Sequence, residues 1–420
     1  MNEAKEGKRH MKKLLCVLLL MVITAQLCAC VSRVSAMGGE NLMQDITAQV
    51  VEGRESDAAF SDAMASFAVK LLNNTHVDGE NTMLSPYSAL LALAMTANGA
   101  DGETLKQMEL VFGLPMEELN AYLYTGLQNE GKELTAANSI WMRDAEDFSV
   151  YETFLQTNAN YYGADVYTAP FDDRTVTEIN TWVAEHTRDR IKSILQTIPE
   201  DASMYLINAL TFLADWEEPY TDDQLREGEF HGANGTVTAE LLHSSEHYYL
   251  EDARAIGFRK NYDGGRYSFI ALLPNEDISV EEYLASLDGK ALLRYIENEQ
   301  YCAVTATMPK FTLNYRADLT DALQIMGMEL AFTNDADFSR MSETPMHISC
   351  VAQKTWICVD EKGTEAAAAT VVEAVPTSAE KPEPPKVVCI DRPFVCGIYD
   401  NEERTFLFLG IVNEAEQAEP

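Results

Sequence analysis

Apolar residues recur at intervals of three and four between residues 60 and 72, and this spacing predicts a helix with one face in a core. The polar run 73–75 marks its end. Further along, residues 208–217 form an apolar run that ends in an aromatic residue and is typical of a buried strand, and residues 406–412 form another strand-like run. The pattern predicts a globular domain that mixes helices and strands.

Residues 361–378, EKGTEAAAATVVEAVPTS, fit two incompatible secondary structures. As a helix, Thr364 caps the start, the alanines favour propagation and Pro376 ends it. With a period of two, Glu365 and Glu373 fall on one face, and the other face carries only small or β-branched side chains. That uncharged face consists of Thr364, Ala366, Ala368, Thr370, Val372 and Ala374. A segment that is acceptable both in solvent and as a central strand suits a conformational switch.

The first ten of these residues resemble the hinge of the inhibitory serpins, which trap proteases by inserting a cleaved loop into their own sheet. The hinge residues are Glu361, Gly363, Thr364, Glu365, Ala366, Ala367, Ala368, Ala369 and Thr370. Other segments resemble serpin landmarks in the usual order, from about residue 57 to about 414. They are residues 81–88, 138–141, 179–183, 208–217, 308–311, 336–339 and 391–394.

The resemblance implies an α+β serpin fold. Its parts would be a large mixed sheet (sheet A in that family), two smaller sheets, eight or nine surrounding helices and an exposed reactive-centre loop. We expect a single domain over residues 57–414, followed by an acidic tail at 415–420. Residues 81–88 would lead from a strand into a helix, with Pro86 in the first turn of that helix.

The resemblance also implies a mechanism: a protease attacks the loop as a substrate and is trapped as its acyl ester when the loop inserts. The family's spacing from Gly363 places the cut between Thr377 and Ser378. The bait residues before it are Ala374, Val375 and Pro376. The small, neutral Thr377 favours an elastase-like serine protease, with subtilisin-like and papain-like proteases as alternatives. Because residues 379–386 hold three prolines and exceed the usual length, a later cut beside Lys381 stays open.

Several residues match positions that control opening of the sheet in that family. A polar cluster beneath the sheet, whose hydrogen bonds would resist opening, consists of Ser85, Ser88, Asn208 and Gln353. The family often has histidine where this chain has Gln353, and glutamine does not titrate, so we do not expect opening to depend on pH. Trp216 matches an aromatic residue at the top of the gap, and Arg294 is expected to face Glu361 as an ion pair.

The charge balance limits the partners. The 420 residues include 31 basic and 67 acidic side chains, for a net charge of −36, and 46% of them are hydrophobic. Nucleic acid is excluded as a partner, because phosphate binding needs clustered Lys and Arg. The same balance argues against a heparin-like polyanion, which some serpins use. We expect a monomer whose partner is the target protease.

The N-terminus resembles a bacterial lipoprotein signal peptide over residues 1–29. Its apolar stretch at 14–23 is too short to span a membrane, and Leu27-Cys28-Ala29-Cys30 resembles a lipobox in which Cys30 carries the lipid. Ordinary secretion with cleavage after Val34-Ser35-Ala36 is the alternative. Residues 30–56 would then tether an extracytoplasmic domain to the membrane.

One pattern suggests metal chemistry. Residues 243–247, HSSEH, match a zinc peptidase motif, which needs both imidazoles on one helical face and the glutamate beside the metal. The following Tyr248-Tyr249-Leu250 favours a strand instead, so we expect no metal, no cofactor and no enzyme activity. The five cysteines beyond Cys30 are odd in number and widely spaced, which favours free buried thiols. The alternative function is a non-inhibitory surface lipoprotein that uses a serpin fold for binding.

Overall fold

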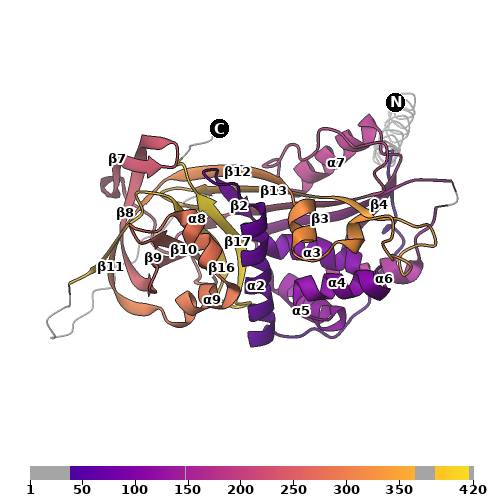
Figure 1. Ribbon diagram of the computed structural model, residues 1–420, viewed down its shortest axis with the longest axis horizontal. Helices are drawn as coiled ribbons and strands as arrows, with labels where there is room; N and C mark the ends of the chain where they lie inside the picture. Colours follow the sequence, from indigo (N-terminus) through magenta and orange to yellow (C-terminus); the bar gives the residue numbers. More distant parts are fainter. Residues whose placement is uncertain (1–37, 147, 365–383, 416–420) are drawn as a thin grey trace, which may run out of the picture.

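The computed structural model describes residues 38–415, except for residue 147 and residues 365–383. These residues form two β-sheets and nine α-helices (Figure 1). Figure 1 shows the strands of the first sheet running along the long axis, and the second sheet filling one half of the molecule. No helix in the described ranges has the length and apolar character needed to cross a bilayer.

The first sheet, called the main sheet below, has eight strands in the order β1-β4-β3-β5-β13-β14-β6, and β12 also pairs with β13. Most neighbours are antiparallel, but two pairs are parallel: β3 with β4, and β5 with β13 at the centre of the sheet. The strands are β1 (Glu40–Asn41), β3 (Leu134–Arg143), β4 (Asp165–Ala169), β5 (Met204–Phe212), β6 (Ala214–Asp215), β12 (Phe311–Asp318), β13 (Ile348–Val359) and β14 (Gly363–Thr364).

The second sheet has nine strands in the order β15-β11-β8-β9-β10-β16-β17-β2, and β7 pairs with β8. The two smaller sheets expected from the resemblance are continuous, because the long β8 pairs with strands of both halves. The strands are β2 (Thr82–Leu84), β7 (Leu225–Gly232), β8 (Gly235–Glu251), β9 (Ala255–Asn261), β10 (Tyr267–Pro274), β11 (Gln300–Pro309), β15 (Lys386–Cys389), β16 (Phe394–Asp400) and β17 (Thr405–Val412).

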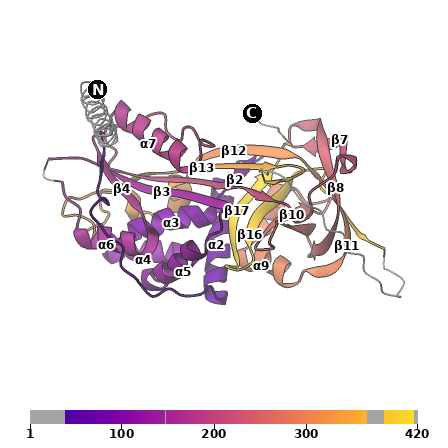
Figure 2. The same ribbon diagram turned by 180° about the vertical axis from the view of Figure 1, so that it is seen from behind.

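The helices cover both faces of the main sheet. Figures 1 and 2 show α7 (Asp173–His186) on one face and α3 to α6 on the other. Alternate residues of β5 follow this division: Ile207 packs in the core under α7, whereas Leu206 and Leu210 pack in the larger core with α3. The other helices are α2 (Ala58–Thr75), α3 (Pro86–Ala97), α4 (Gly102–Phe112), α5 (Met116–Asn129), α6 (Glu152–Tyr162), α8 (Val280–Ser286), α9 (Gly289–Glu297) and α10 (Thr320–Ile325).

Helix α2 lies where the sequence predicts it, and α3 begins at the predicted position. Asp57 caps α2 by accepting hydrogen bonds from the backbone N–H groups of Ala59 and Phe60. The helix ends at Thr75, as the polar run indicates. Ser85 caps α3, Pro86 takes its first position, and all of its residues are buried. Helix α3 is therefore a fixed apolar support beneath the main sheet.

The segment expected to be a tether differs from that prediction. Of residues 30–56, the structure describes 38–56 and places them against the domain. Glu40 and Asn41 form β1, which pairs with β4, and the N–H of Leu42 donates to the carbonyl of Val166. The Glu178 carboxylate on α7 accepts a hydrogen bond from the N–H of Gly39 at 3.0 Å. We call residues 38–56 the N-terminal arm; it completes the edge of the main sheet.

Residues 243–247 lie in β8, so the metal interpretation fails on geometry. Side chains alternate along a strand, and Glu246 therefore points away from His243 and His247. Its carboxylate instead forms a buried ion pair with Lys260 at 2.9 Å. The described residues hold no cluster of potential metal ligands. None of the five described cysteines forms a disulfide bond, but only Cys350 and Cys396 are buried as expected; Cys302 and Cys358 are partly exposed and Cys389 is exposed.

Candidate functional site

The candidate site is the parallel junction between β5 and β13. Eight residues of β13, from Ile348 to Trp356, pair with Met204 to Thr211 of β5, and Gln353 is opposite Asn208. If these two parallel neighbours separated, a third strand antiparallel to both could pair with each of them. The structure contains the beginning of such a strand.

That beginning is β14. Thr364 pairs antiparallel with Val359 of β13 and, on its other side, with Ala214 of β6. Gly363 pairs with Asp215, and the backbone approaches so closely that a Cβ on Gly363 would lie 2.0 Å from the carbonyl oxygen of Ala214. Only glycine fits there. The hinge therefore enters the sheet at the point where β5 and β13 diverge.

A tight turn directs the hinge into this position. The N–H of Asp360 donates to the carbonyl of Gly363 at 3.0 Å. The Asp360 carboxylate accepts hydrogen bonds from the N–H groups of Lys362 and Gly363, at 2.8 and 3.1 Å. Aspartate favours turns because its side chain accepts hydrogen bonds from backbone N–H groups two or three residues further along the chain. The reversal after β13 is thus fixed by Asp360 and Gly363 together.

Thr364 is fully buried, as the period of two requires. Its hydroxyl lies 2.7 Å from the hydroxyl of Tyr262, and burial raises the pKa of that tyrosine well above its usual value. Tyr262 stacks on Trp216 with ring centroids 4.3 Å apart. The indole of Trp216 donates to the carbonyl of Asp360 at 2.9 Å. Trp216 thus lies at the end of the junction, in contact with the turn.

The expected ion pair between Arg294 and Glu361 is wrong. Glu361 pairs with Lys310 at 2.6 Å, and Lys310 also reaches Glu240 at 3.1 Å. Burial would raise the pKa of Glu361, but the Lys310 ammonium outweighs it and holds that pKa below its usual value. Arg294 lies on α9, a helix packed against α2. The pairing of β12 with β13 explains why Glu361 contacts Lys310. Phe311 is opposite Val359, and Lys310 therefore lies beside the turn that follows β13.

The four residues of the expected polar cluster do come together beneath the junction. Gln353 donates from Nε2 to the Ser85 carbonyl at 2.9 Å and to Asn208 Oδ1 at 2.6 Å. Its Oε1 accepts from the Ser85 N–H at 2.9 Å. Asn208 in turn donates from Nδ2 to the hydroxyl of Ser88. All four side chains are essentially inaccessible to solvent. These bonds join α3, β5 and β13.

The sequence analysis missed a fifth member, Asn138 on β3. Its Oδ1 accepts hydrogen bonds from Asn208 Nδ2 and from the Ser88 hydroxyl, the latter at 3.1 Å. Asn138 is opposite Asn208 in the antiparallel pairing of β3 with β5. Two asparagines in otherwise apolar strands were the available signal, since buried amides need each other as partners. The cluster therefore extends across three adjacent strands.

The remaining predicted site residues lie outside the described residues. They are the hinge residues Glu365, Ala366, Ala367, Ala368, Ala369 and Thr370, the bait residues Ala374, Val375 and Pro376, the reactive bond Thr377–Ser378, and the lipidation residue Cys30. Their assignments stay predictions.

Comparison with known proteins gives consistent matches. Residues 62–415 match the family model described as serpin (serine protease inhibitor). An uncharacterized serpin-like protein of Thermococcus kodakarensis is 31% identical over 372 residues, covering 86% of each chain.

Among solved structures, the crystal structure of the thermophilic serpin tengpin in its native state has a TM-score of 0.85 and 41% identity. It covers 90% of this chain and 100% of its own. The latent state of tengpin matches less well, with a TM-score of 0.75 and 38% identity, over 87% of this chain and 100% of its own.

Proposed function

Because this chain belongs to the serpin family, we propose that it is a suicide inhibitor that traps an elastase-like serine protease by inserting its cleaved loop between β5 and β13. The family model that this chain matches is described as a serine protease inhibitor. The chain's covalent chemistry is therefore that of a substrate: the protease hydroxyl attacks the loop carbonyl, the new amine leaves, and the ester remains on the protease.

The observation that carries the proposal is the position of Thr364. This residue is buried between β13 and β6, while the rest of β13 still pairs directly with β5. The strand that would separate β5 from β13 has thus begun, and its first side chain is already in a buried environment. Continuing the same alternation would direct Ala366, Ala368 and Thr370 inward, all without charge.

The energy available from insertion is large. Residues 363–377, fully extended, would span roughly 50 Å. A strand paired on both edges can form roughly twenty hydrogen bonds at about 0.5–1.5 kcal/mol net each, and a gain on the order of ten kcal/mol is large beside ordinary fold stability. The intact protein would then be held by a kinetic barrier. An acyl-enzyme dragged over that distance is distorted before water can hydrolyse its ester.

The protease class is proposed from the residue before the cut. Thr377 is small and neutral, and it would fit the narrow primary pocket of an elastase better than an acidic or a deep aromatic pocket. Subtilisin-like and papain-like proteases are the alternatives. Mass spectrometry of the C-terminal peptide released by the protease would identify the bond.

Incubation with pancreatic elastase tests the proposal. We expect an adduct that survives SDS and has the summed mass of protease and inhibitor, less the released peptide. Nicked protein should also unfold at a markedly higher temperature than intact protein. Cleavage without an adduct, and without this rise, would favour the alternative of a serpin-fold binding protein. In that case the shared architecture would remain and inhibition would be excluded for elastase.

Location and assembly are part of the proposal. A lipid on Cys30 would hold a monomeric inhibitor at a membrane surface outside the cytoplasm. Detergent partitioning of the protein and of a Cys30→Ser variant, expressed from the full chain in a bacterium, would test this. Partitioning of both proteins into the aqueous phase would instead indicate ordinary secretion.

A further inference from the structure

A basic surface lies on the α7 side of the main sheet, in a chain whose net charge is −36. Three of its cations, Arg188, Arg190 and Lys192, follow α7 closely, and all three are exposed. The other two are Arg316 on β12 and Lys354 on β13. We call these five residues the basic patch. They come from three separate segments, so no single sequence motif reveals them.

Contacts between the loop after α7 and β13 hold the basic patch together. Lys354 Nζ donates to the Ser193 carbonyl at 2.8 Å. The guanidinium of Arg190 lies over the ring of Trp356, 5.4 Å from its centroid. Lys354 and Trp356 are two residues apart on β13 and therefore point to the same side of the sheet. Residues 188–192 consequently lie against this part of β13.

Two cations of the patch repel each other. Arg316 is directly opposite Lys354 in the antiparallel pairing of β12 with β13, and like charges in this position destabilise a sheet. Burial lowers the pKa of Lys354, and the Arg316 guanidinium lowers it further. Among the described residues, no carboxylate forms an ion pair with either of them, or with Arg188 or Lys192. The patch therefore carries positive charge that the protein itself does not neutralise.

The neighbouring carboxylates are few. Residues 188–193, β12 and β13 contain two acidic residues, Asp189 and Asp318, beside the five cations. The Asp318 carboxylate already accepts hydrogen bonds from Thr320, from its N–H at 3.0 Å and from its hydroxyl at 2.6 Å. The patch is thus locally positive, whereas the chain as a whole is strongly negative. An anionic surface would be repelled by the chain's net charge and attracted at this place.

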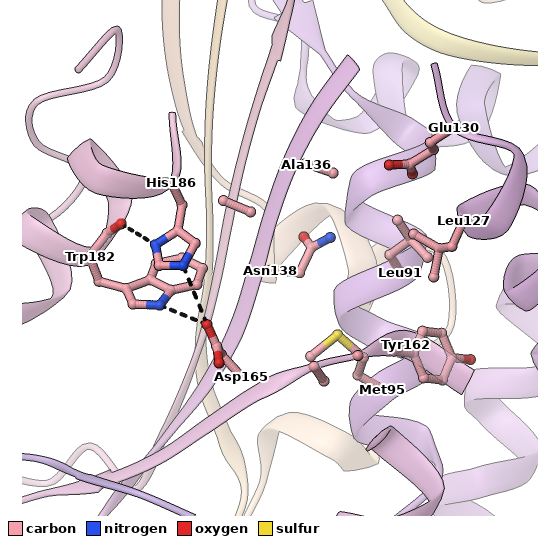
Figure 3. Close-up of a pocket in the computed structure, with 13 residues that line it drawn as sticks. Leu91, Met95, Leu127, Glu130, Ala136, Asn138, Tyr162, Asp165, Trp182 and His186 are labelled. Atoms are coloured by element: carbon pink, nitrogen blue, oxygen red, sulfur yellow. Dashed lines mark hydrogen bonds and ion pairs between the residues drawn. The ribbon is translucent and has the colours of Figure 1, made fainter. Parts of the chain in front are cut away.

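The basic patch rests on a fixed support. At the end of α7, the Asp165 carboxylate of β4 accepts a hydrogen bond from the Trp182 indole at 3.0 Å and lies 3.6 Å from His186 (Figure 3). After α7, Ile191 is buried in the core beneath the helix. Residues 188–192 are therefore held on both sides of Arg190, and their charged side chains stay at the surface.

The basic patch lies near the N-terminal arm. The Gly39 N–H donates to the Glu178 carboxylate on α7 at 3.0 Å. A rise of about 1.5 Å per residue along α7 places Arg188 about 15 Å from Glu178. The chain from Cys30 to Gly39 can span at most roughly 30 Å. A lipid on Cys30 would thus keep the patch within reach of the membrane that holds the lipid.

We propose that the basic patch docks this protein on an anionic lipid surface, where headgroup phosphates bind its five cations. The proposal rests on the membrane location proposed above, but the patch itself binds lipid phosphate whether or not Cys30 is acylated. Each lysine or arginine near an anionic membrane favours binding about fivefold. Carboxylates farther from the surface than the screening length of about 8 Å oppose this contact only weakly. Docking turns the α7 face of the main sheet toward the membrane.

Sedimentation with vesicles tests lipid binding by the mature chain without its lipid, residues 31–420. Vesicles of phosphatidylcholine mixed with phosphatidylglycerol should bind the chain, phosphatidylcholine alone should not, and salt at about 1 M should abolish binding. Lys192→Gln combined with Arg316→Gln should weaken binding about 25-fold, because two exposed cations are lost. Lys70→Gln combined with Lys290→Gln is the matched control. It removes the same charge from α2 and α9, away from the α7 face, and should leave binding unchanged.

Tryptophan fluorescence tests which face binds. Three of the four tryptophans, Trp141, Trp182 and Trp216, are at most 2% exposed, whereas Trp356 is partly exposed beside Arg190. Acrylamide should therefore quench mainly Trp356, and anionic vesicles should reduce that quenching severalfold. Trp356→Phe should remove the quenched component, which would assign the signal to this residue.

Binding to phosphatidylcholine alone, equal binding by the two double variants, or vesicle binding that leaves Trp356 open to acrylamide would overturn the proposal. Tighter binding to heparin than to the anionic vesicles would assign the patch to a soluble polyanion and would also overturn it. Detergent partitioning reports separately on the anchor. Aqueous partitioning together with binding to anionic vesicles would contradict the anchor and support the patch. Detergent partitioning without vesicle binding by the lipid-free chain would support the anchor and overturn the patch.

Discussion

The hydroxyl groups of Thr364 and Tyr262 lie 2.7 Å apart in a fully buried position. This contact links the second residue of β14 to the residue that follows β9. It shows that the hinge has entered the main sheet by the two residues of β14, although β5 and β13 remain paired below it.

Thr364→Arg should convert the inhibitor into a substrate. The variant must place a guanidinium where Tyr262 and Trp216 leave no solvent, and an unpaired buried charge opposes insertion. We expect cleavage by elastase with almost no SDS-stable adduct. Thr364→Val, which keeps the shape but loses the hydroxyl bond, should retain adduct formation. Stable adducts with the arginine variant would contradict the role of this position.

Lys310→Gln should loosen the turn after β13. It removes the 2.6 Å partner of Glu361 and leaves that half-buried carboxylate without a cation. The expected loss is about 1 kcal/mol in the free energy of unfolding, measured by urea denaturation at pH 7. Arg294→Gln is the matched control and should change nothing comparable, because Arg294 lies on α9. An equal effect of both variants would argue against this ion pair.

Gln353→His should make opening of the main sheet depend on pH below 6.5, because a histidine titrates there and Gln353 does not titrate. A neutral histidine can serve the cluster, but protonation removes the acceptor that the Ser85 N–H needs. Burial lowers the pKa of such a histidine below 6.5, so stability is kept above that pH and lost as the pH falls through the lowered value. A synthetic peptide with the sequence of residues 364–377 should therefore insert into the main sheet faster as the pH falls from 6.5 to 5, and only in the variant. If the rate of peptide insertion did not change with pH in either protein, the contact between residue 353 and Ser85 would not control opening of the sheet.

Glu130→Gln should stabilise the protein at high pH. Burial raises the pKa of Glu130 from 4.5 to about 7, with opposing effects from Tyr87 and Arg266 and a further rise from Asp400. Because the folded protein favours the neutral acid, the contribution of Glu130 to the free energy of unfolding is full below pH 4.5 and is lost as the pH rises through 7. The free energy of unfolding of the variant should exceed that of the natural protein by up to about 3 kcal/mol at pH 8, and the two should be equal at pH 4.5. Equal urea midpoints at pH 8 would show that Glu130 is well solvated.

A chain that begins at residue 57 should be less stable than one that begins at residue 38. The shorter chain lacks β1 and exposes the edge of β4, together with the apolar surface under Leu42, Met43 and Ile46. We expect a loss of about 2–4 kcal/mol in the free energy of unfolding and a tendency to associate through the free edge. Urea denaturation and light scattering would measure the two effects. Identical behaviour would mean that the N-terminal arm is only loosely attached.

The sequence predicted those features that are encoded locally. The apolar spacing of α2, Pro86 at the start of α3 and the burial of Thr364 all follow from periods of 3.6 or 2 within one segment. The cluster of Ser85, Ser88, Asn208 and Gln353 was placed through the resemblance to a family.

Features that depend on register between distant strands were missed. Lys310 reaches Glu361 only because β12 pairs with β13, and Asn138 joins the cluster only because β3 pairs with β5. β1 was missed because two residues carry no period. Its position is determined by the free edge of β4 and by the Glu178 carboxylate.

The parallel pairing of β5 with β13 limits how many times one molecule of the protein can act. On the proposed mechanism, a strand can be inserted between β5 and β13 once, by the reactive-centre loop of the same chain, and insertion releases no product that would restore the starting shape. The reaction would need no nucleotide or other fuel, but it would allow no second round. Protection against a protease would therefore be stoichiometric, and the cell's rate of synthesis, rather than any turnover number, would limit how much protease can be removed.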